Sequence, residues 1–74
     1  MRGVVRGVVH HWDRARGFGK IGGEDRRTYF AHRTELLDVL DLTSGERVEF
    51  EPVENERGPR AANVRVLQAA GRNR

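Results

Sequence analysis

The stretch "RGFGKI" at residues 16–21 sets one large aromatic residue, Phe18, between two glycines and follows it with Lys20. A second stretch, Thr28–His32, carries Phe30 and His32 two residues apart. Rings and cations close together suit a flat, negatively charged ligand, because bases stack on aromatic rings and phosphates pair with Lys or Arg. The glycines leave the Phe18 ring clear of side chains along the strand, so we expect such a ligand to reach it.

Three histidines invite a metal-site interpretation, which their positions do not favour. His10 and His11 are adjacent, so on a strand they point to opposite faces, and neither a cysteine nor a third ligand stands at a suitable spacing. The acidic residues are scattered, and Ser44 is the only serine. The segment Gly17–Gly19 is no phosphate-binding loop, because no helix start follows it. We therefore expect no enzymatic activity, no metal and no other cofactor.

Composition bounds the class of protein but does not choose its function. The 74 residues suffice for one small domain with a small core. Lys and Arg number 14 against 11 Asp and Glu, and nearly all the cations are Arg, which fits either a GC-rich genome or a polyanionic partner. Cysteine is absent, and no apolar run is long enough for a membrane span or a signal peptide. We expect a cytoplasmic protein that does not contact membranes.

Short apolar runs separated by turn signals predict an all-β domain. The expected strands are Val4–Trp12, Phe18–Ile21, Thr28–His32, Arg47–Val53 and Ala62–Leu67. A helix competes only at residues 34–42, where we expect a single turn at most. Five short strands favour a closed antiparallel barrel, since a sandwich would need more strands. We expect residues 1–68 to form the barrel and residues 69–74 to form a polar, basic tail.

Side chains in the second and third strands alternate between two faces. One face carries Phe18 and Lys20 from one strand, and Phe30 and His32 from the next. We expect this face to meet solvent, because a lysine on the core side would have to be buried. The inward positions expected across the sheet are Ile21, Tyr29, Ala31, Val48, Phe50, Ala62, Val64 and Val66. An exposed face with two phenyl rings, an imidazole and an ammonium group suits a single-stranded nucleic acid. The opposite arrangement, with both phenylalanines in the core, stays open.

The stretches "GVVHHWDRARGFGKI", "TYFAHRTEL" and "GERVEFEPVENERGPRAANVRVL" carry four short motifs in order. In that order and spacing they resemble the bacterial cold-shock proteins, over about residues 7–67. The resemblance implies a five-stranded OB-fold barrel that binds single-stranded RNA and DNA, with low sequence preference, through its second and third strands. It also implies an RNA chaperone or a regulator of transcription or translation, and no enzyme.

The resemblance assigns stacking roles to particular residues. Phe18 takes the place of the first aromatic in the family's K-G-F-G-F motif, and Phe30 and His32 take those of V-F-V-H-F. Trp12 stands where the phenylalanine of W-F-N is usual, and His11 replaces the tryptophan before it. Strict alternation puts His11 and Trp12 on opposite faces, so a bulge or bend is needed if this end of the strand meets the ligand. We expect Trp12 to contact the ligand and keep His11 as a further candidate.

The resemblance also assigns the cations. Arg16 and Arg57 stand for basic positions of the family, while Lys20 and Arg33 replace phenylalanines and Val39 replaces a loop phenylalanine. We expect all four cations to hold phosphates, and Arg33 could also stack on a base. With fewer rings and more charge, affinity should depend steeply on salt.

Two further alternatives stay open. The same barrel, with stacking residues replaced, could dock a protein instead of a nucleic acid. We expect a monomer, but the connection over residues 33–42 is short enough for a dimer in which two chains exchange strands to be considered.

Overall fold

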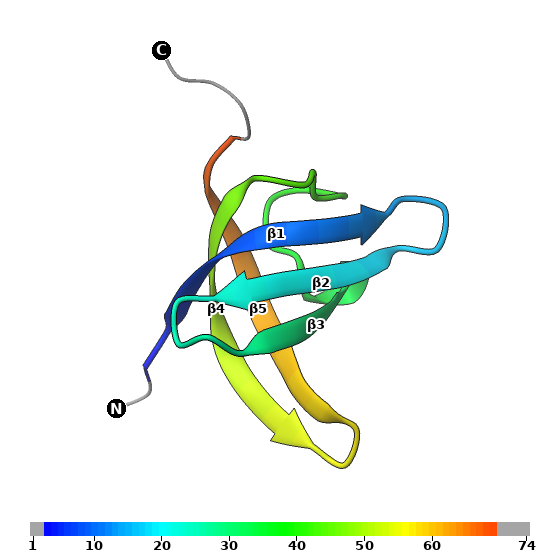
Figure 1. The fold of residues 1–74 in the computed structure, drawn as a ribbon. Helices are drawn as coiled ribbons and strands as arrows, with labels where there is room; N and C mark the ends of the chain where they lie inside the picture. The colour runs from blue at the N-terminus through cyan, green and yellow to red at the C-terminus, as the bar shows by residue number, and fades with distance from the viewer. Residues whose placement is uncertain (1–2, 70–74) are drawn as a thin grey trace.

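The computed structural model describes residues 3–69. Its elements are β1 (Val5–Asp13), β2 (Phe18–Gly23), β3 (Thr28–His32), the short 3-10 helix η1 (Arg33–Glu35), β4 (Arg47–Asn55) and β5 (Gly58–Gln68). The strands close into a barrel in the order β1-β2-β3-β5-β4, as Figure 1 shows. The prediction of an all-β, five-stranded barrel is confirmed. Its strand pairs are antiparallel except β3 with β5, which run parallel where they close the barrel.

β2, β4 and β5 reach further than the sequence predicts, β3 has the predicted bounds, and the helix is as short as expected. β4 and β5 form a long hairpin whose turn lies between Asn55 and Gly58, and Gly58 adopts a φ of 112° that favours glycine. Residues 34–42 contain only the end of η1 before Leu36 bridges to Val64 of β5. In residues 3–69 no helix is long and apolar enough to span a membrane. Of the predicted tail, residues 70–74 fall outside the described part of the chain.

The core confirms which face of β2 and β3 points inward. Ile21, Tyr29 and Ala31 are buried, whereas Phe30 on the other face of β3 is 38% exposed. The alternative that places both phenylalanines in the core is therefore wrong. Tyr29 packs edge-on against Phe50 of β4, with ring centroids 4.8 Å apart. The strand alternation that the sequence displays is enough to orient this part of the sheet.

A bulge in β1 decides the position of Trp12. Val9 lies opposite Ile21, and His11 lies opposite Lys20, so His10 has no partner in β2. The bulge leaves His10 and His11 both exposed and turns Trp12 inward, where its side chain is only 9% exposed. This bulge lies before His11, so His11 and Trp12 stay on opposite faces, as strict alternation predicts, and Trp12 is the one that points into the core. This corrects the expectation that Trp12 offers a stacking surface.

The bulge also gives Gly19 a role that the sequence did not indicate. A Cβ at this buried position would lie 2.1 Å from the carbonyl oxygen of His11 and 2.8 Å from Cα of Trp12. Gly19 therefore makes room for β1 and the indole inside the barrel, since backbone atoms cannot move away as a flexible side chain could. It does not serve to clear space around the Phe18 ring, as we expected.

A second bulge lies in β5. Glu49 of β4 pairs with Arg65, but Glu51 pairs with Ala62, so β5 carries an additional residue between these pairs. Asn63 adopts a φ of 50° there, a left-handed conformation that Asn tolerates better than most residues. As a result Ala61 is fully buried in place of Ala62, which corrects the predicted face of Ala62. Val64, beyond the bulge, points inward as predicted.

Candidate nucleic-acid interface

Phe18, Lys20, Phe30 and His32 lie together on the outer face of β2 and β3, and we call them the aromatic platform. Lys20 is directly opposite Phe30, and Phe18 is directly opposite His32. The two phenyl rings are 5.7 Å apart between centroids and tilted by 34°. Such a separation is typical of rings in contact, so the pair forms one continuous apolar surface. The structure brings together the four residues that the alternation predicted.

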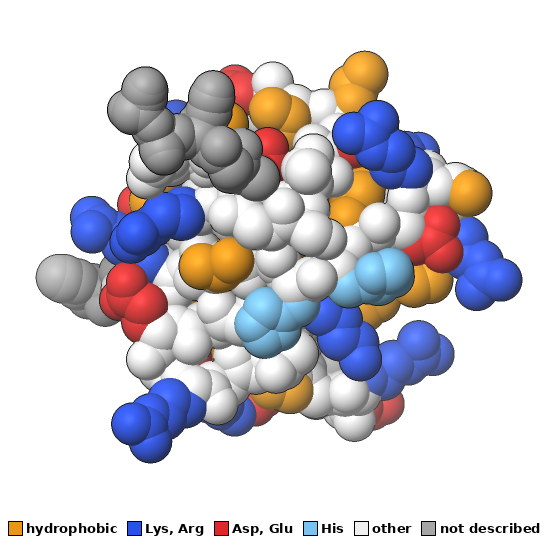
Figure 2. Space-filling model, turned by 45° about the horizontal axis from the view of Figure 1, so that its top comes forward, with side chains coloured by type: hydrophobic (Ala, Val, Ile, Leu, Met, Phe, Trp, Pro, Cys, Tyr) orange, Lys and Arg blue, Asp and Glu red, His pale blue; other side chains and the backbone are white. Residues whose placement is uncertain are grey.

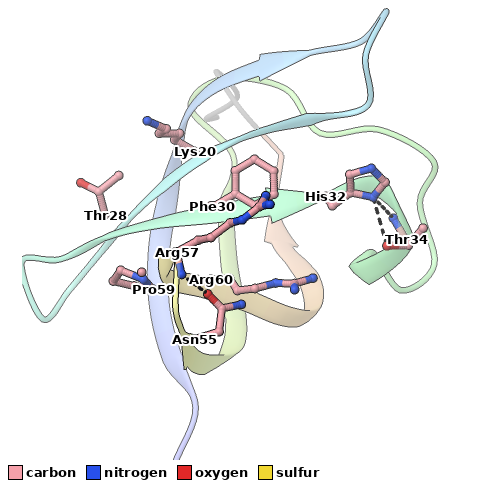
Figure 3. A pocket seen from close by; sticks show the side chains of 10 residues that line it. Lys20, Thr28, Phe30, His32, Thr34, Asn55, Arg57, Pro59 and Arg60 are labelled. Atoms are coloured by element: carbon pink, nitrogen blue, oxygen red, sulfur yellow. Dashed lines mark hydrogen bonds between the residues drawn. The ribbon is translucent and has the colours of Figure 1, made fainter.

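Three of the four platform residues, Lys20, Phe30 and His32, line a groove of about 580 Å³, which we call the platform groove. Figure 3 shows Phe30 at its centre, with Lys20 on the side of β2 and the β4–β5 hairpin opposite. The hairpin contributes Asn55, Arg57 and Arg60 to the lining. Rings on one wall and guanidinium groups on the other match a ligand with flat bases and a charged backbone.

The cations of the groove differ in their freedom to bind a ligand. Lys20 and Arg57 make no ion pair within residues 3–69. Arg60 lies beside Phe30 in the β3–β5 register and pairs with Glu35 at 3.6 Å. Arg57 was predicted from the sequence, but Arg60 was not, because its place beside Phe30 depends on the parallel pairing of β3 with β5. Lys20 and Arg57 are thus the cations most available to phosphates.

His32 is held in a fixed orientation at the end of β3. The backbone N–H of Thr34 donates to Nδ1 of His32 at 3.2 Å, and the Thr34 hydroxyl lies 3.0 Å from the same nitrogen. Because a backbone N–H can only donate, Nδ1 accepts, and the proton of the neutral ring sits on Nε2. Thr34 thereby holds the imidazole in one orientation at the edge of the groove. The sequence did not single out Thr34, which lines the groove as well.

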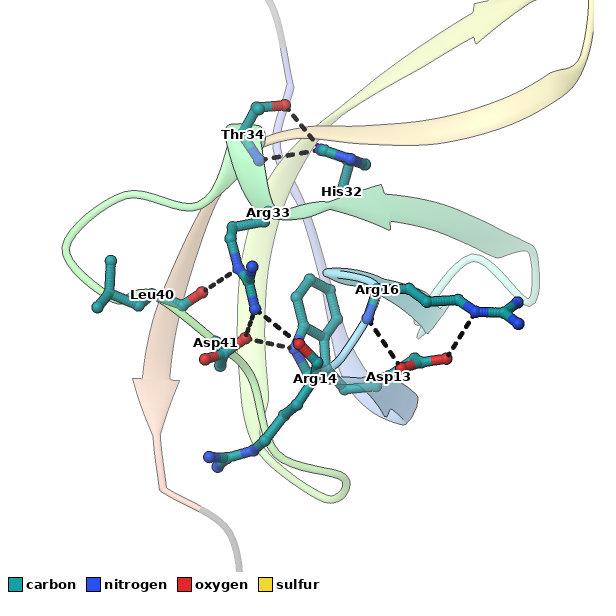
Figure 4. A network of polar contacts seen from close by, with 9 residues as sticks. Asp13, Arg14, Arg16, His32, Arg33, Thr34, Leu40 and Asp41 are labelled. Atoms are coloured by element: carbon teal, nitrogen blue, oxygen red, sulfur yellow. Dashed lines mark hydrogen bonds and ion pairs between the residues drawn. The ribbon is translucent and has the colours of Figure 1, made fainter.

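The buried Trp12 is anchored from outside the barrel. Its Nε1–H donates to Oδ1 of Asp41 at 3.0 Å. The Asp41 carboxylate also accepts from the Arg33 guanidinium, as Figure 4 shows. The pKa of Asp41 lies below its usual range, chiefly because of the hydrogen bond from Arg33 and then that from Trp12. An anionic Asp41 thus accepts from the indole and from the guanidinium together.

Arg33 faces away from the platform, which corrects its expected role in binding phosphates or bases. Its Nε donates to the carbonyl of Leu40 at 3.1 Å, and its Nη2 donates to the carbonyl of Arg14 at 2.9 Å. Nη2 also reaches Asp41. The guanidinium therefore links the β1–β2 turn to the loop that precedes β4, and three of its five N–H donors are engaged there (Figure 4).

His11 and Arg16 extend the charged surface beyond the groove. His11 is exposed and pairs across the strands with Lys20, so it continues the row of side chains that begins at Phe30. Arg16 lies in the β1–β2 turn with its side chain 74% exposed, and its nearest acid is Asp13 at 3.9 Å. Figure 2 shows histidine side chains on one face of the molecule with Lys and Arg side chains around them. Both residues remain candidates for ligand contacts.

Comparison with known proteins adds to this geometry. The chain matches the family model of the 'Cold-shock' DNA-binding domain over residues 5–67. It belongs to the cold-shock domain family. It is 42% identical over 65 residues to a cold shock-like protein of Aquifex aeolicus, covering 84% of this chain and 93% of that protein. It is 39% identical over 63 residues to cold shock protein CspA of Staphylococcus aureus, covering 82% and 96% respectively. The chain is thus a nucleic-acid-binding protein of the cold-shock type.

Two basic residues of this cold-shock domain replace phenylalanines of the family motifs, and the structure uses them differently. Lys20 stands beside Phe30, at the position of the second phenylalanine in the family's G-F-G-F motif, and is exposed. Arg33 also replaces a phenylalanine, but it has become part of the internal hydrogen-bond network. Only the Lys20 replacement therefore exchanges a ring for a charge on the platform itself.

Proposed function

We propose that the protein binds single-stranded RNA and DNA, with low sequence preference, on the aromatic platform and in the platform groove. The observation that carries the proposal is the contact between Phe18 and Phe30 beside Lys20 and Arg57, two cations without ion pairs in residues 3–69. We further propose that it acts in the cytoplasm as an RNA chaperone or as a regulator of transcription or translation.

Bases would stack on the rings while phosphates follow the cations of the opposite wall. Each base stacked on a ring contributes about 1–3 kcal/mol, and every base has a face that can stack. The interaction is therefore tolerant of sequence. A base held on Phe18 or Phe30 is not free to pair with another base, which is how such a protein would keep RNA from folding on itself.

Charge should carry a large share of the affinity. Lys20, Arg57 and Arg60 line the groove, and each phosphate that they neutralise adds about 0.7 to the slope of log affinity against log salt for a single strand. Three such contacts give a slope of about −2. A slope near zero would contradict the assignment of these side chains to phosphates.

The test replaces Phe30 by Ala and measures binding of a labelled oligo-dT by fluorescence anisotropy at low salt. Loss of one stacking ring should lower the affinity about 5-fold to 150-fold. Because Phe30 is 38% exposed, the variant should remain folded, which circular dichroism verifies. Leu67→Ala is the matched control, since Leu67 is 45% exposed but lies outside the groove.

Two results would count against the proposal. If Phe30→Ala binds as tightly as the unaltered protein, the rings are not the stacking surface. If the folded, unaltered protein binds no oligonucleotide even at low salt, a protein-interaction module becomes the better interpretation of the same face.

We propose that the protein binds as a monomer. Arg33 joins the β1–β2 turn to the loop before β4 through the carbonyls of Arg14 and Leu40. An exchange of strands between two chains would have to open these bonds, so the network favours the monomer over the strand-exchanged dimer. Size-exclusion chromatography with light scattering distinguishes the two states.

A further inference from the structure

A second groove, of about 420 Å³, lies next to the platform groove. We call it the β1 groove, because β1 crosses its floor with Val8 and His10. Its basic rim includes Arg26, from the β2–β3 turn, and Arg47, at the start of β4. Thr28 lines both grooves, so the two adjoin on the outside of the barrel.

Strand register explains why the two grooves adjoin. Thr28 of β3 is opposite Gly22 of β2, Gly22 is opposite Val8 of β1, and Val8 is opposite Arg47 of β4. This row of residues crosses four strands and runs beside the neighbouring row of Phe30, Lys20 and His11. A ligand that lies along the platform is therefore led toward β1 and Arg47.

The floor of the β1 groove depends on the bulge and on a glycine. A Cβ at Gly22 would lie 2.2 Å from Nε2 of His10, so only a residue without a side chain lets the imidazole lie over the strand. Val8, 40% exposed, adds apolar surface beside the ring. Backbone at Gly22, the His10 ring and the Val8 side chain thus line the groove together.

The charge of the β1 groove suits an anion. Arg26 and Arg47 have no ion-pair partner within residues 3–69, whereas the third arginine of the lining, Arg27, pairs with Glu54 at 2.7 Å. Glu24 is the one acid among the lining residues. The imidazole of His10 is the one aromatic ring in that lining, which contains no Phe, Tyr or Trp, so the β1 groove offers less to a base by stacking than to a phosphate through its arginines.

We propose that the β1 groove holds the sugar–phosphate chain of a single strand whose neighbouring bases lie on the aromatic platform. Arg26 and Arg47 would neutralise phosphates beyond the stacked bases, and His10 and Val8 would support the sugars. This inference rests on the proposed function. It adds that the binding site continues across β1 to β4 and that longer strands gain affinity from charge alone.

The test compares oligo-dT of about four and about twelve nucleotides, which span the site sizes known for one barrel of this type. The short strand should occupy the platform alone, and the long strand should also reach Arg47. Arg47→Gln should lower affinity for the long strand about 3-fold to 10-fold at low salt and reduce its salt slope by about 0.7. Affinity for the short strand should stay unchanged.

Arg65→Gln is the charge-matched control. Arg65 lies on β5 with its side chain 52% exposed, outside both grooves. Arg65→Gln removes one positive charge, as Arg47→Gln does. Because Arg65 lies outside both grooves, affinity for either strand should hardly change. Arg26→Asn is a second variant of the β1 groove. Asn is chosen because it tolerates the left-handed φ of 71° at this position. It should reproduce the pattern of Arg47→Gln.

The outcomes separate this inference from the proposed function. Equal losses for Arg47→Gln and Arg65→Gln, or equal losses for the short and long strands, would overturn the β1 groove as a binding site. If Phe30→Ala still weakens the short strand in that case, the platform stands without the extension. If the unaltered protein binds neither strand, both proposals fall.

Discussion

Replacing Arg33 by Met tests whether this arginine supports the fold or the ligand. Met keeps an unbranched stem of similar reach but has no donors, so all three hydrogen bonds of the guanidinium disappear. Arg16→Met is the matched comparison, because Arg16 is 74% exposed and donates no side-chain hydrogen bond within residues 3–69. The structure predicts that Arg33→Met lowers stability and leaves binding unchanged, whereas Arg16→Met leaves stability unchanged and weakens binding.

The magnitude follows from the two bonds to backbone carbonyls. Each contributes about 0.5–1.5 kcal/mol net, because the exposed carbonyls of Leu40 and Arg14 can bind water once the guanidinium is gone. We add nothing for the partly exposed ion pair with Asp41, since such pairs contribute little. Arg33→Met should therefore destabilise the fold by about 2 kcal/mol, which lowers Tm by roughly 8–16 °C in a domain of this size. A stability of about 4–11 kcal/mol leaves the variant folded.

The assay has two readouts, urea unfolding followed by circular dichroism and the salt dependence of oligo-dT affinity. Arg33→Met should shift unfolding and leave the salt slope unchanged. Arg16→Met should change stability by less than about 0.5 kcal/mol and lower the slope by about 0.7, if Arg16 holds one phosphate. The reasoning is refuted if Arg33→Met keeps full stability and loses salt slope, because Arg33 would then be a ligand contact.

Two other substitutions test the core and its outer anchor. Gly19→Ala should lower the stability of the fold by about 1–3 kcal/mol or more, since the new Cβ would lie 2.1 Å from the His11 carbonyl oxygen. Gly3→Ala is the control: its Cβ would meet no atom within 4 Å, so stability should change by less than about 0.5 kcal/mol. Thermal unfolding measures both variants. Asp41→Asn should flatten the loss of stability in acid. The pKa of Asp41 is lowered, so its anion stabilises the fold above about pH 4, and that contribution is lost as the pH falls through the lowered value. The measurement is the free energy of urea unfolding from about pH 6 to about pH 2, for the unaltered protein and for Asp41→Asn. If stability falls equally with pH in both proteins, this account is contradicted.

The platform could be predicted because β2 and β3 alternate without interruption. Lys20 marks the outer face of β2, and the short turn to β3 fixes an antiparallel pair, so Phe30 and His32 follow onto the same face. Periodicity, one exposed charge and one turn are all local signals. The aromatic platform can therefore be predicted from the sequence alone.

Bulges account for the strand residues that were placed wrongly. One additional residue moves every later side chain to the other face, and neither the His10 bulge nor the one at Asn63 interrupts a visible alternation strongly enough to be located. Trp12 and Ala62 both lie next to such a bulge. Their positions depend on pairing with other strands, which a single strand's pattern does not contain.

Long-range partners account for the cations that were misjudged or missed. Arg33 finds its acceptors at Arg14 and Leu40, in two loops that the fold brings together. Arg60 reaches Phe30 only because β3 and β5 run parallel to close the barrel. The sequence shows that a residue is basic. Whether its side chain faces the groove or binds a backbone carbonyl depends on how the barrel closes.

The glycines on either side of Phe18 are best explained from inside the protein. Gly19 is bare because Trp12 packs against it, and the buried indole needs an acceptor, which Asp41 supplies. That carboxylate in turn has its countercharge in Arg33, whose guanidinium would lie 3.2 Å from a Cβ on Gly17, a residue whose φ of 76° already favours glycine. The large ring in the core is thus accompanied by a small residue beside it, an acid that accepts its N–H and a base that pairs with the acid. The arginine that follows His32 therefore belongs to this internal network, and Lys20 is the substitution that changes the charge of the platform.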